Sequence, residues 1–241
     1  DLAFGGENEA DDSGSIRYLS IRFAGALGSN GNAVDGLTLA GVGSDTTVRF
    51  VEVFASRHDA FALRGGTVNL KNLAAAFAYD DGFDADQGWI GKSQFWFSIQ
   101  ESNTEVSPLL DPDTAVEFDG QVRDSGTGIV GGTNIVHATF IGAGPGASDK
   151  SAILARDNAF LKLWNSVVVD FDYLARFAAD NQTRLADGDN DFLSVTVSSH
   201  VAANNTASGA VDPVTPPENR VLLEALFSNE RKVRFEDPLL A

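Results

Sequence analysis

Residues 59–66 read Asp59-Ala60-Phe61-Ala62-Leu63-Arg64-Gly65-Gly66, and their pattern returns 22 positions later as Asp81-Gly82-Phe83-Asp84-Ala85-Asp86-Gln87-Gly88. The same offset of 22 places the run at 48–53 over the run at 70–75, and Asp35 precedes Asp59 by 24. Each unit contains an acidic residue, a short strand, a Gly-rich turn and a longer strand. Units this short cannot bury their apolar faces alone, so they must stack on their neighbours.

The residues within these units favour strands over helices. The runs at 51–53 and 193–197 alternate with a period of two and are rich in β-branched residues. Further runs that we expect to form coils lie at 16–23, 95–99, 135–141, 166–171 and 192–201. The pattern predicts an all-β fold, a right-handed parallel β-helix with coils of about 22–24 residues and strands about 4.8 Å apart.

We expect one β-helix domain over residues 1–241. Its predicted parts are an acidic, Gly-rich segment at 1–15, coils over 16–201 with a long insertion at 101–133, a loop at 202–215, a capping helix at 216–228 and a tail at 229–241. Thr215-Pro216-Pro217-Glu218 reads as a capping box. Val221, Leu222, Ala225 and Leu226 form the helix face expected to cover the last coil. No such cap precedes Ile16, so upstream coils or a partner are expected at the N-terminal end.

The composition excludes several classes of function. The 17 Lys and Arg residues stand against 34 Asp and Glu, a net charge of −17. Nucleic acids and anionic membranes are therefore not expected partners, since both require clustered cations. The chain has no Cys, which excludes disulfides and thiolate sites. No apolar run approaches the ~20 residues of a membrane span. Because the chain starts at Asp1 without Met, we expect a processed or truncated, exported product.

Several short motifs resemble a known group of proteins. They are Phe4-Gly5-Gly6, Asp11-Asp12-Ser13-Gly14, Gly36-Leu37-Thr38-Leu39, Gly65-Gly66-Thr67-Val68 and Asp80-Asp81-Gly82-Phe83-Asp84 through Gln87-Gly88. On these residues the chain resembles bacterial secreted or cell-surface right-handed β-helix proteins with the pectin-lyase-like fold, and in particular their C-terminal half. The resemblance covers roughly residues 4–100 well and the rest loosely. It implies the fold and a secreted or cell-surface location, but no established reaction.

Asp35, Asp59 and Asp81 occupy equivalent positions on consecutive coils, and two interpretations of this acidic row remain open. In the first, Asp59, Asp80, Asp81 and Asp84 provide an acid and a base for glycoside hydrolysis, or coordinate calcium for polyuronate cleavage. In the second, each Asp caps the backbone where a strand begins. Alternation points Phe83 inward and Asp84 outward. His58, next to Asp59, is expected near the cluster.

A candidate glycan site lies beside the acidic row. If Phe95 and Phe97 fill the interior, Trp96 is displayed, and with Trp89 it could stack on sugar rings. The alternative is that segment 101–133 covers Trp96. Arg64 is the cation of this candidate site, although it also aligns with Asp86 one coil later as an ion pair.

A candidate calcium site lies at Asp187-Gly188-Asp189-Asn190-Asp191, where Asp187, Asp189 and Asp191 offer oxygen ligands at alternating positions. The motif lacks the Glu that completes a calcium loop. A solvated acidic loop is the alternative.

The leading hypothesis is a secreted or cell-surface β-helix module with a structural, adhesive or assembly role, with calcium and a glycan or a neighbouring subunit as its ligands and no organic cofactor. The alternative is a carbohydrate-active enzyme, a polysaccharide hydrolase or lyase that uses the acidic cluster. The two differ in geometry, because an enzyme needs two carboxylates facing an open groove.

Overall fold

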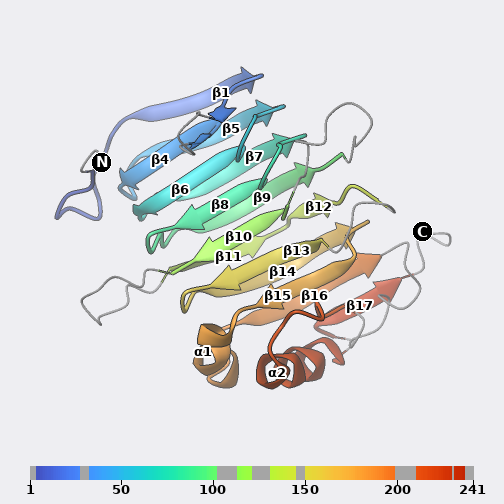
Figure 1. Cartoon of the computed structure of the whole chain (residues 1–241). Coiled ribbons are helices and arrows are strands. Elements are labelled where there is room, and N and C mark those ends of the chain that lie inside the picture. Colours follow the sequence, from blue (N-terminus) through green and yellow to red (C-terminus); the bar gives the residue numbers. More distant parts are fainter. Residues whose placement is uncertain are drawn as a thin grey trace.

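The computed structural model describes residues 4–27, 33–101, 113–120, 131–144, 150–198, 210–229 and 231–236. Two parallel sheets form the walls of the molecule and stack coil on coil along one axis (Figure 1). The nine-stranded sheet contains β1 (Ser15–Arg22), β5 (Thr47–Phe54), β7 (Leu70–Ala76), β9 (Lys92–Ile99), β11 (Gly132–Val136), β12 (Thr139–Ile141), β14 (Phe160–Val169), β16 (Asp191–Ser198) and β17 (Val233–Glu236). The six-stranded sheet contains β4 (Leu37–Val42), β6 (Phe61–Gly66), β8 (Phe83–Asp86), β10 (Val116–Asp119), β13 (Ser151–Arg156) and β15 (Tyr173–Phe177).

The strand register reproduces the offsets of the sequence repeat. Phe61 pairs with Phe83 and Val48 with Leu70, each 22 residues apart. Leu37 pairs with Phe61 at an offset of 24. The predicted parallel β-helix is therefore confirmed. A short antiparallel pair, β2 (Ala26–Leu27) and β3 (Ala33–Val34), lies outside both sheets.

The core runs between the two sheets and is filled by stacked side chains. The Phe61 and Phe83 rings stack at 5.0 Å between centroids, and the Phe83 and Trp96 rings at 4.1 Å. Trp89 packs beside Trp96 at 6.2 Å. Phe61 and Phe83 occupy equivalent positions on successive coils, so each coil buries its ring against that of its neighbour.

A bend divides each long strand of the nine-stranded sheet. One residue of each rung has a positive φ of 50–61°, and the column is Tyr18, Phe50, Asn72, Phe95, His137, Asn165 and Ser194. At each bend two consecutive residues point outward, as Arg49 and Phe50 do, before alternation resumes with buried Val51. The inward–outward alternation of side chains before the bend therefore does not predict which side chains point inward after it.

That bend overturns the expected orientation of residues 95–97. Phe95 and Phe97 are exposed, whereas Trp96 is only 1% exposed and stacks inside the core. The left-handed conformation of Phe95 turns its side chain outward and places Trp96 toward the other sheet.

The segment predicted as one insertion at 101–133 contains a coil strand. β10 pairs with β8 on one side and β13 on the other, so it completes the six-stranded sheet. Residues 102–112 and 121–130 of this segment lie outside the described residues. Within the predicted loop at 202–215, residues 202–209 also lie outside them, and Val211 forms a bridge to Ala175.

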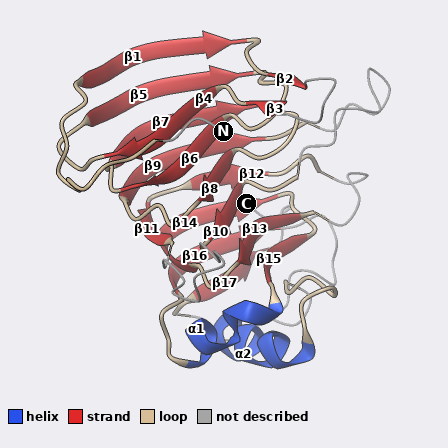
Figure 2. Cartoon of the chain, turned by 60° about the vertical axis from the view of Figure 1, so that its left-hand side comes forward, coloured by secondary structure: helices blue, strands red, loops and turns tan. Residues whose placement is uncertain are grey.

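Helices close the C-terminal end of the solenoid (Figure 2). The predicted capping helix is α2 (Pro217–Phe227), but Leu223 and Phe227 form its buried face while Val221 is exposed. The predicted capping box is wrong, because Pro216 is the N-cap and no side chain caps the helix.

Two further elements at this end were not predicted. A short 3₁₀ turn, η1 (Ala179–Asn181), and α1 (Gln182–Ala186) pack beside α2. Strand β17, in the predicted tail, pairs with β16. None of the helices in the described part of the chain is long and apolar enough to cross a membrane.

Candidate functional site

The acidic row lies at the corner that precedes the six-stranded sheet. Asp35, Asp59 and Asp81 each stand two residues before Leu37, Phe61 and Phe83, which pair in register. The predicted stacking of the three aspartates is therefore confirmed. The backbone continues the ladder, because Gly36 N–H donates to Asp59 O and Ala60 N–H to Asp81 O.

The buried carboxylates of this row bind the backbone of the following coil. Asp59 Oδ1 accepts from Asp81 N–H at 3.1 Å. Asp81 Oδ1 accepts from both Thr114 N–H at 2.7 Å and Thr114 Oγ1 at 2.8 Å. Asp59 and Asp81 are only 2% and 3% exposed. Asp59 and Asp81 thus cap the backbone of the next coil along the chain and not that of their own turns. These hydrogen bonds tie successive coils together.

His58 lies against the acidic row, near the cluster as predicted, and offsets part of its negative charge. Its Nδ1 lies 2.7 Å from Asp35 Oδ1 and 3.2 Å from Asp59 Oδ2, and its Nε2 lies 3.2 Å from Asp80 Oδ2. The hydrogen bond to Asp59 is the main cause that raises the pKa of His58 to about 9, against the opposing effect of burial. The imidazole is therefore protonated at neutral pH and offsets part of the carboxylate charge.

The other end of the row holds more carboxylate than cation. Burial, reinforced by the charge of Asp59, raises the pKa of Asp80 to about 6 and that of Asp81 well above its usual value. Ligand oxygens of Asp59, Asp80 and Asp81 lie within 4.8 Å of one another, as do those of Asp81, Asp113 and Glu117. Two cations pair with this end: Lys150, whose Nζ lies 3.6 Å from Asp113, and Arg156, which contacts Glu117. The two groups share Asp81, so they form one continuous chain of hard oxygen ligands that could hold a metal ion.

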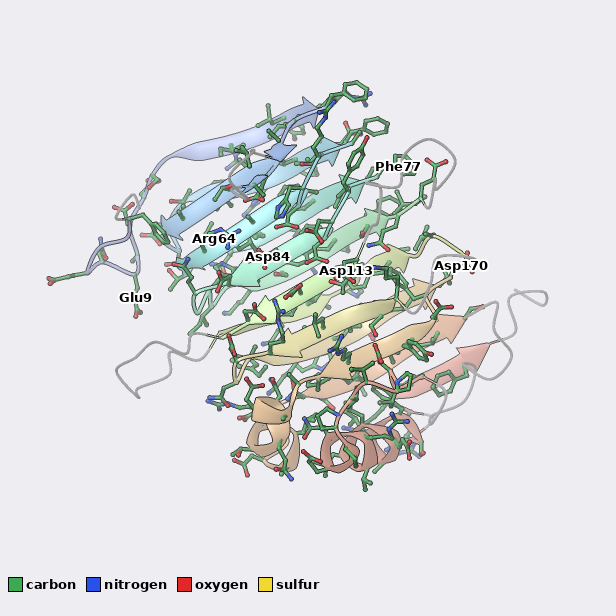
Figure 3. The ribbon with its side chains drawn as sticks, in the orientation of Figure 1. Glu9, Arg64, Phe77, Asp84, Asp113 and Asp170 are labelled. Carbon is green, nitrogen blue, oxygen red and sulfur yellow. The ribbon has the colours of Figure 1, made fainter. Side chains whose placement is uncertain are left out.

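A second set of carboxylates covers the outward face of the six-stranded sheet. Asp84, Asp86, Glu117 and Asp119 come from β8 and β10, which pair in register. Arg64 and Asp84 lie close together on this face (Figure 3), 3.2 Å apart. Arg64 also lies 3.0 Å from Asp86, which confirms the predicted pairing of these two residues. Arg156 lies on the other side, 2.9 Å from Asp119 and in contact with Glu117.

Despite these ion pairs, two of the outward carboxylates, Asp84 and Asp119, are hard to ionise. Burial and the charge of Asp59 raise the pKa of Asp84 to about 8. Burial and the charge of Asp86 raise the pKa of Asp119 to about 7. At neutral pH Asp84 is therefore mostly protonated and able to donate a proton. Asp84 points outward while Phe83 is buried, as predicted.

The structure does not form the predicted glycan site. Trp89 and Trp96 are each 1% exposed and stack on one another inside the core, so neither can bind a sugar ring. Arg64 lies outside and is engaged by Asp84 and Asp86.

The predicted calcium loop is not formed either. Asp189 pairs with Arg184 at 2.7 Å, and Asp191 pairs with Lys232 and accepts from Trp164 Nε1 at 3.1 Å. Asp187 is the C-cap of α1. Two separate cations thus neutralise Asp189 and Asp191, and the oxygens of Asp187, Asp189 and Asp191 do not converge.

Asp113, Glu117 and Asp119 were missed because they lie in the segment predicted as an insertion. A signal was present, since Val116-Glu117-Phe118-Asp119 repeats the apolar–acidic alternation of Phe83-Asp84-Ala85-Asp86 at an offset of 33. The longer offset concealed it, because a solenoid can lengthen one turn without changing the strand that follows.

Comparison with known families agrees with this architecture. A family model described as a pectate-lyase-like β-helix domain matches residues 1–225. The chain belongs to this family. No curated protein and no solved structure matched the chain. The comparisons thus establish the fold family of this pectate-lyase-like β-helix domain.

Proposed function

We propose that this chain is a secreted or cell-surface β-helix module that binds calcium in its acidic row and serves an adhesive or assembly role. The observation that carries the proposal is the overlap of oxygen ligands at Asp59, Asp80, Asp81, Asp113 and Glu117. Calcium takes about six to eight oxygen ligands, and carboxylates supply them with matching charge. A bound cation would also offset the burial and the repulsion from Asp59 that together raise the pKa of Asp80 and Asp81.

The backbone bonds of Asp59 and Asp81 support a structural role for such an ion. Both side chains already join consecutive coils, so a cation between them would add a further link along the axis. The secreted or cell-surface location is supported by the resemblance of the sequence to β-helix proteins found there.

Thermal unfolding with calcium and with a chelator tests the proposal. Calcium at about 100 times its Kd should raise the Tm by about 5–10 °C, because it binds only the folded state. Asp81→Asn keeps an acceptor for Thr114 but removes one charged ligand, so it should abolish most of that rise. Asp45→Asn, at an exposed turn outside the row, is the matched control and should respond like the wild type. An unchanged wild-type Tm in calcium would contradict the proposal.

A second candidate function is polysaccharide hydrolysis on the outward face of the six-stranded sheet. The observation in its favour is the raised pKa of Asp84, about 8, which suits a general acid, with Asp86 or Asp119 as the partner carboxylate. Asp84→Asn should then abolish the release of reducing sugar from a responsive polysaccharide without lowering the Tm. Absence of release from neutral and acidic polysaccharides alike would exclude this candidate.

A further inference from the structure

The N-terminal end of the solenoid exposes the edge of the nine-stranded sheet. β1 pairs with β5 on one side and with no strand of the described residues on the other, whereas helices close the opposite end (Figure 2). The first strand of the other sheet, β4, is partly covered by the chain itself, because the backbone at Gly5 and Asp11 packs on Gly41 and Gly43. A strand edge with free N–H and C=O groups is a template for pairing with another strand.

Apolar side chains gather on the same edge strand. Tyr18 is 79% exposed, and Phe23, directly after β1, is 74% exposed. Leu19 is also exposed, although its partner in register on β5 is buried. Ile16 and Ile21 pack against the core but are only half-buried, because they lie on the outermost strand. Apolar side chains concentrated at one sheet edge indicate a surface that another protein covers.

The sequence of β1, Ser-Ile-Arg-Tyr-Leu-Ser-Ile-Arg, is complementary to itself in the antiparallel direction. Two copies related by a two-fold axis between Tyr18 and Leu19 bring each isoleucine opposite an isoleucine and each arginine opposite a serine. No like charges are then directly opposed. The left-handed bends at Tyr18 of the two copies meet at the axis, so the bends do not break the pairing elsewhere. The facing pairs are Ser15 with Arg22, Ile16 with Ile21, Arg17 with Ser20, and Tyr18 with Leu19.

The charges on the outward face favour the same arrangement. Within one chain Arg17 aligns with Arg49, and Arg49 aligns with Lys71, so like charges stand side by side. Across the two-fold axis the line of Arg17 continues to Ser20 of the partner subunit and then to Glu52 of the partner subunit. In each copy Ser20 aligns with Glu52 and donates to its Oε2 at 2.7 Å. Each Arg17 thus gains a carboxylate about two strand spacings away, or ~10 Å between backbones, which the long arginine side chain largely spans.

We propose that two copies of this chain associate end to end through antiparallel pairing of their β1 strands about a two-fold axis between Tyr18 and Leu19. The two nine-stranded sheets then form one continuous sheet with a capping helix at each end. Because both copies use the same edge, the contact is closed and produces a dimer instead of a filament. The inference names a partner for the assembly role proposed above and rests on that role only in this respect. Neither calcium nor the acidic row takes part in the pairing.

The mass of the chain in solution tests the proposal. In buffer with chelator, sedimentation equilibrium should show a mass that rises with protein concentration from 25.5 kDa to twice that value. Tyr18→Asp should weaken dimerisation at least tenfold, because it places two like charges beside the axis. Asp tolerates the left-handed φ of 56° at this position, so the bend itself is kept.

Phe95→Asp is the matched control for this variant. Phe95 is exposed and has a φ of 58° in the same bend column, but it lies on β9 away from the edge. It should dimerise like the wild type. A chain that stays monomeric at every concentration would overturn the proposal and favour a further coil as the cover of β1. Equal dimerisation of Tyr18→Asp and the wild type would overturn it as well.

Arg17→Glu separates association from folding. In its own chain the change removes a cation beside Arg49, so the Tm should not fall at concentrations where the wild type is monomeric. In the dimer the new carboxylate would lie in line with Glu52 of the partner subunit, so dimerisation should weaken severalfold. Dimerisation as strong as that of the wild type would contradict the proposed register.

Disulfide trapping locates the axis, because the chain has no Cys of its own. Tyr18→Cys places two thiols across the axis with Cα atoms about 6 Å apart, a separation that a disulfide bridges. Ser15→Cys places them about 20 Å apart and should not form a linked dimer. A mixture of Arg17→Cys and Ser20→Cys chains should link to each other.

Linkage of Ser15→Cys as fast as that of Tyr18→Cys would exclude the two-fold pairing. Asp81→Asn should dimerise like the wild type, which separates this test from the calcium test. Failure of calcium to raise the Tm would therefore leave the dimer standing, and a monomeric chain would leave the calcium proposal standing.

Discussion

His58 and Asp80 show how this protein tolerates a row of buried carboxylates. His58 contacts Asp35, Asp59 and Asp80 and stays protonated, while Asp80 itself is hard to ionise. Asp59 and Asp81 gain hydrogen bonds from the next coil, which partly offset their burial. The row is thus held by cations at both ends, with His58 and Arg64 at Asp35 and Lys150 at Asp113, and by backbone donors between them.

These shifts predict how stability depends on pH. The folded-state pKa of His58, about 9, exceeds the ordinary value of 6.5, so its contribution is complete below pH 6.5 and is lost as the pH rises through 9. Asp80, Asp84 and Asp119 also have raised pKa values, so their ionisation weakens the fold as the pH rises through about 6 to 8. Without calcium, the free energy of unfolding should therefore fall steadily from pH 5 to pH 9.

His58→Gln isolates the histidine part of this dependence. At pH 6 it should lower the free energy of unfolding by about 1–3 kcal/mol, because it leaves buried acceptors without a charged donor. At pH 9.5 the loss should be much smaller. Urea unfolding followed by fluorescence measures both values, and His137→Gln, outside the row, is the control. A loss that is equal at the two pH values would show that His58 acts only by packing.

The left-handed residue at the bend changes the direction of each long strand of the nine-stranded sheet. Seven residues in left-handed conformation stack in a column there, and none of the seven is glycine. Neighbours in the column contact each other, as the Tyr18 and Phe50 rings do at 4.9 Å and Phe95 and His137 at 5.3 Å. Ring stacking thus compensates part of the cost of about 1–2 kcal/mol that a left-handed residue carries.

Asn72 allows a test of this cost, because its φ is 58° and its side chain is half-buried in the same column. Asn72→Val should destabilise the protein by about 1–2 kcal/mol, since a β-branched residue is poorly suited to this conformation. Asn72→Gly should change the free energy of unfolding by less than about 0.5 kcal/mol, because the relief of strain offsets the lost side chain. Denaturant unfolding of both variants measures the difference. Equal effects would argue against a conformational origin.

The whole molecule is a stack with one closed end. Leu223 and Phe227 of α2 are at most 1% exposed, and the Phe227 ring meets Phe192 of β16 edge to face at 5.0 Å. At the other end β1 is the edge strand of its sheet, and Leu19 is 39% exposed. That further coils or a partner cover this end stays a prediction.

Loss of the cap should affect the entire stack. Phe227→Ala and Leu223→Ala should each lower the free energy of unfolding by about 2–5 kcal/mol, as expected for large-to-small changes in a core. Val221 on the same helix is 66% exposed. Val221→Ala should therefore change the free energy of unfolding by less than about 0.5 kcal/mol. Thermal and urea unfolding provide the values. Similar small effects in all three variants would show that the helix does not stabilise the solenoid.

The sequence alone determined the fold, the stacking of Asp35, Asp59 and Asp81, the proximity of His58, the Arg64–Asp86 pair and the position of the capping helix. In a parallel solenoid a fixed offset along the chain becomes a contact between coils, so a repeat of 22 residues predicts register directly. Contacts between residues that are separated by this fixed offset were therefore predictable from the sequence.

Only the tertiary structure decided the rest. The left-handed bend at Phe95 set which aromatic side chains are buried, and the long turn before β10 hid the place of Asp113 and Glu117 in the acidic row. Arg184 and Lys232 neutralised Asp189 and Asp191 from elements with no repeat relation to them. The register also aligns Arg49, Lys71, Gln94, Val136 and Trp164, which come from five strands at unequal offsets along the chain. Such features depend on turn lengths and backbone conformation, which vary between coils without disturbing the strands.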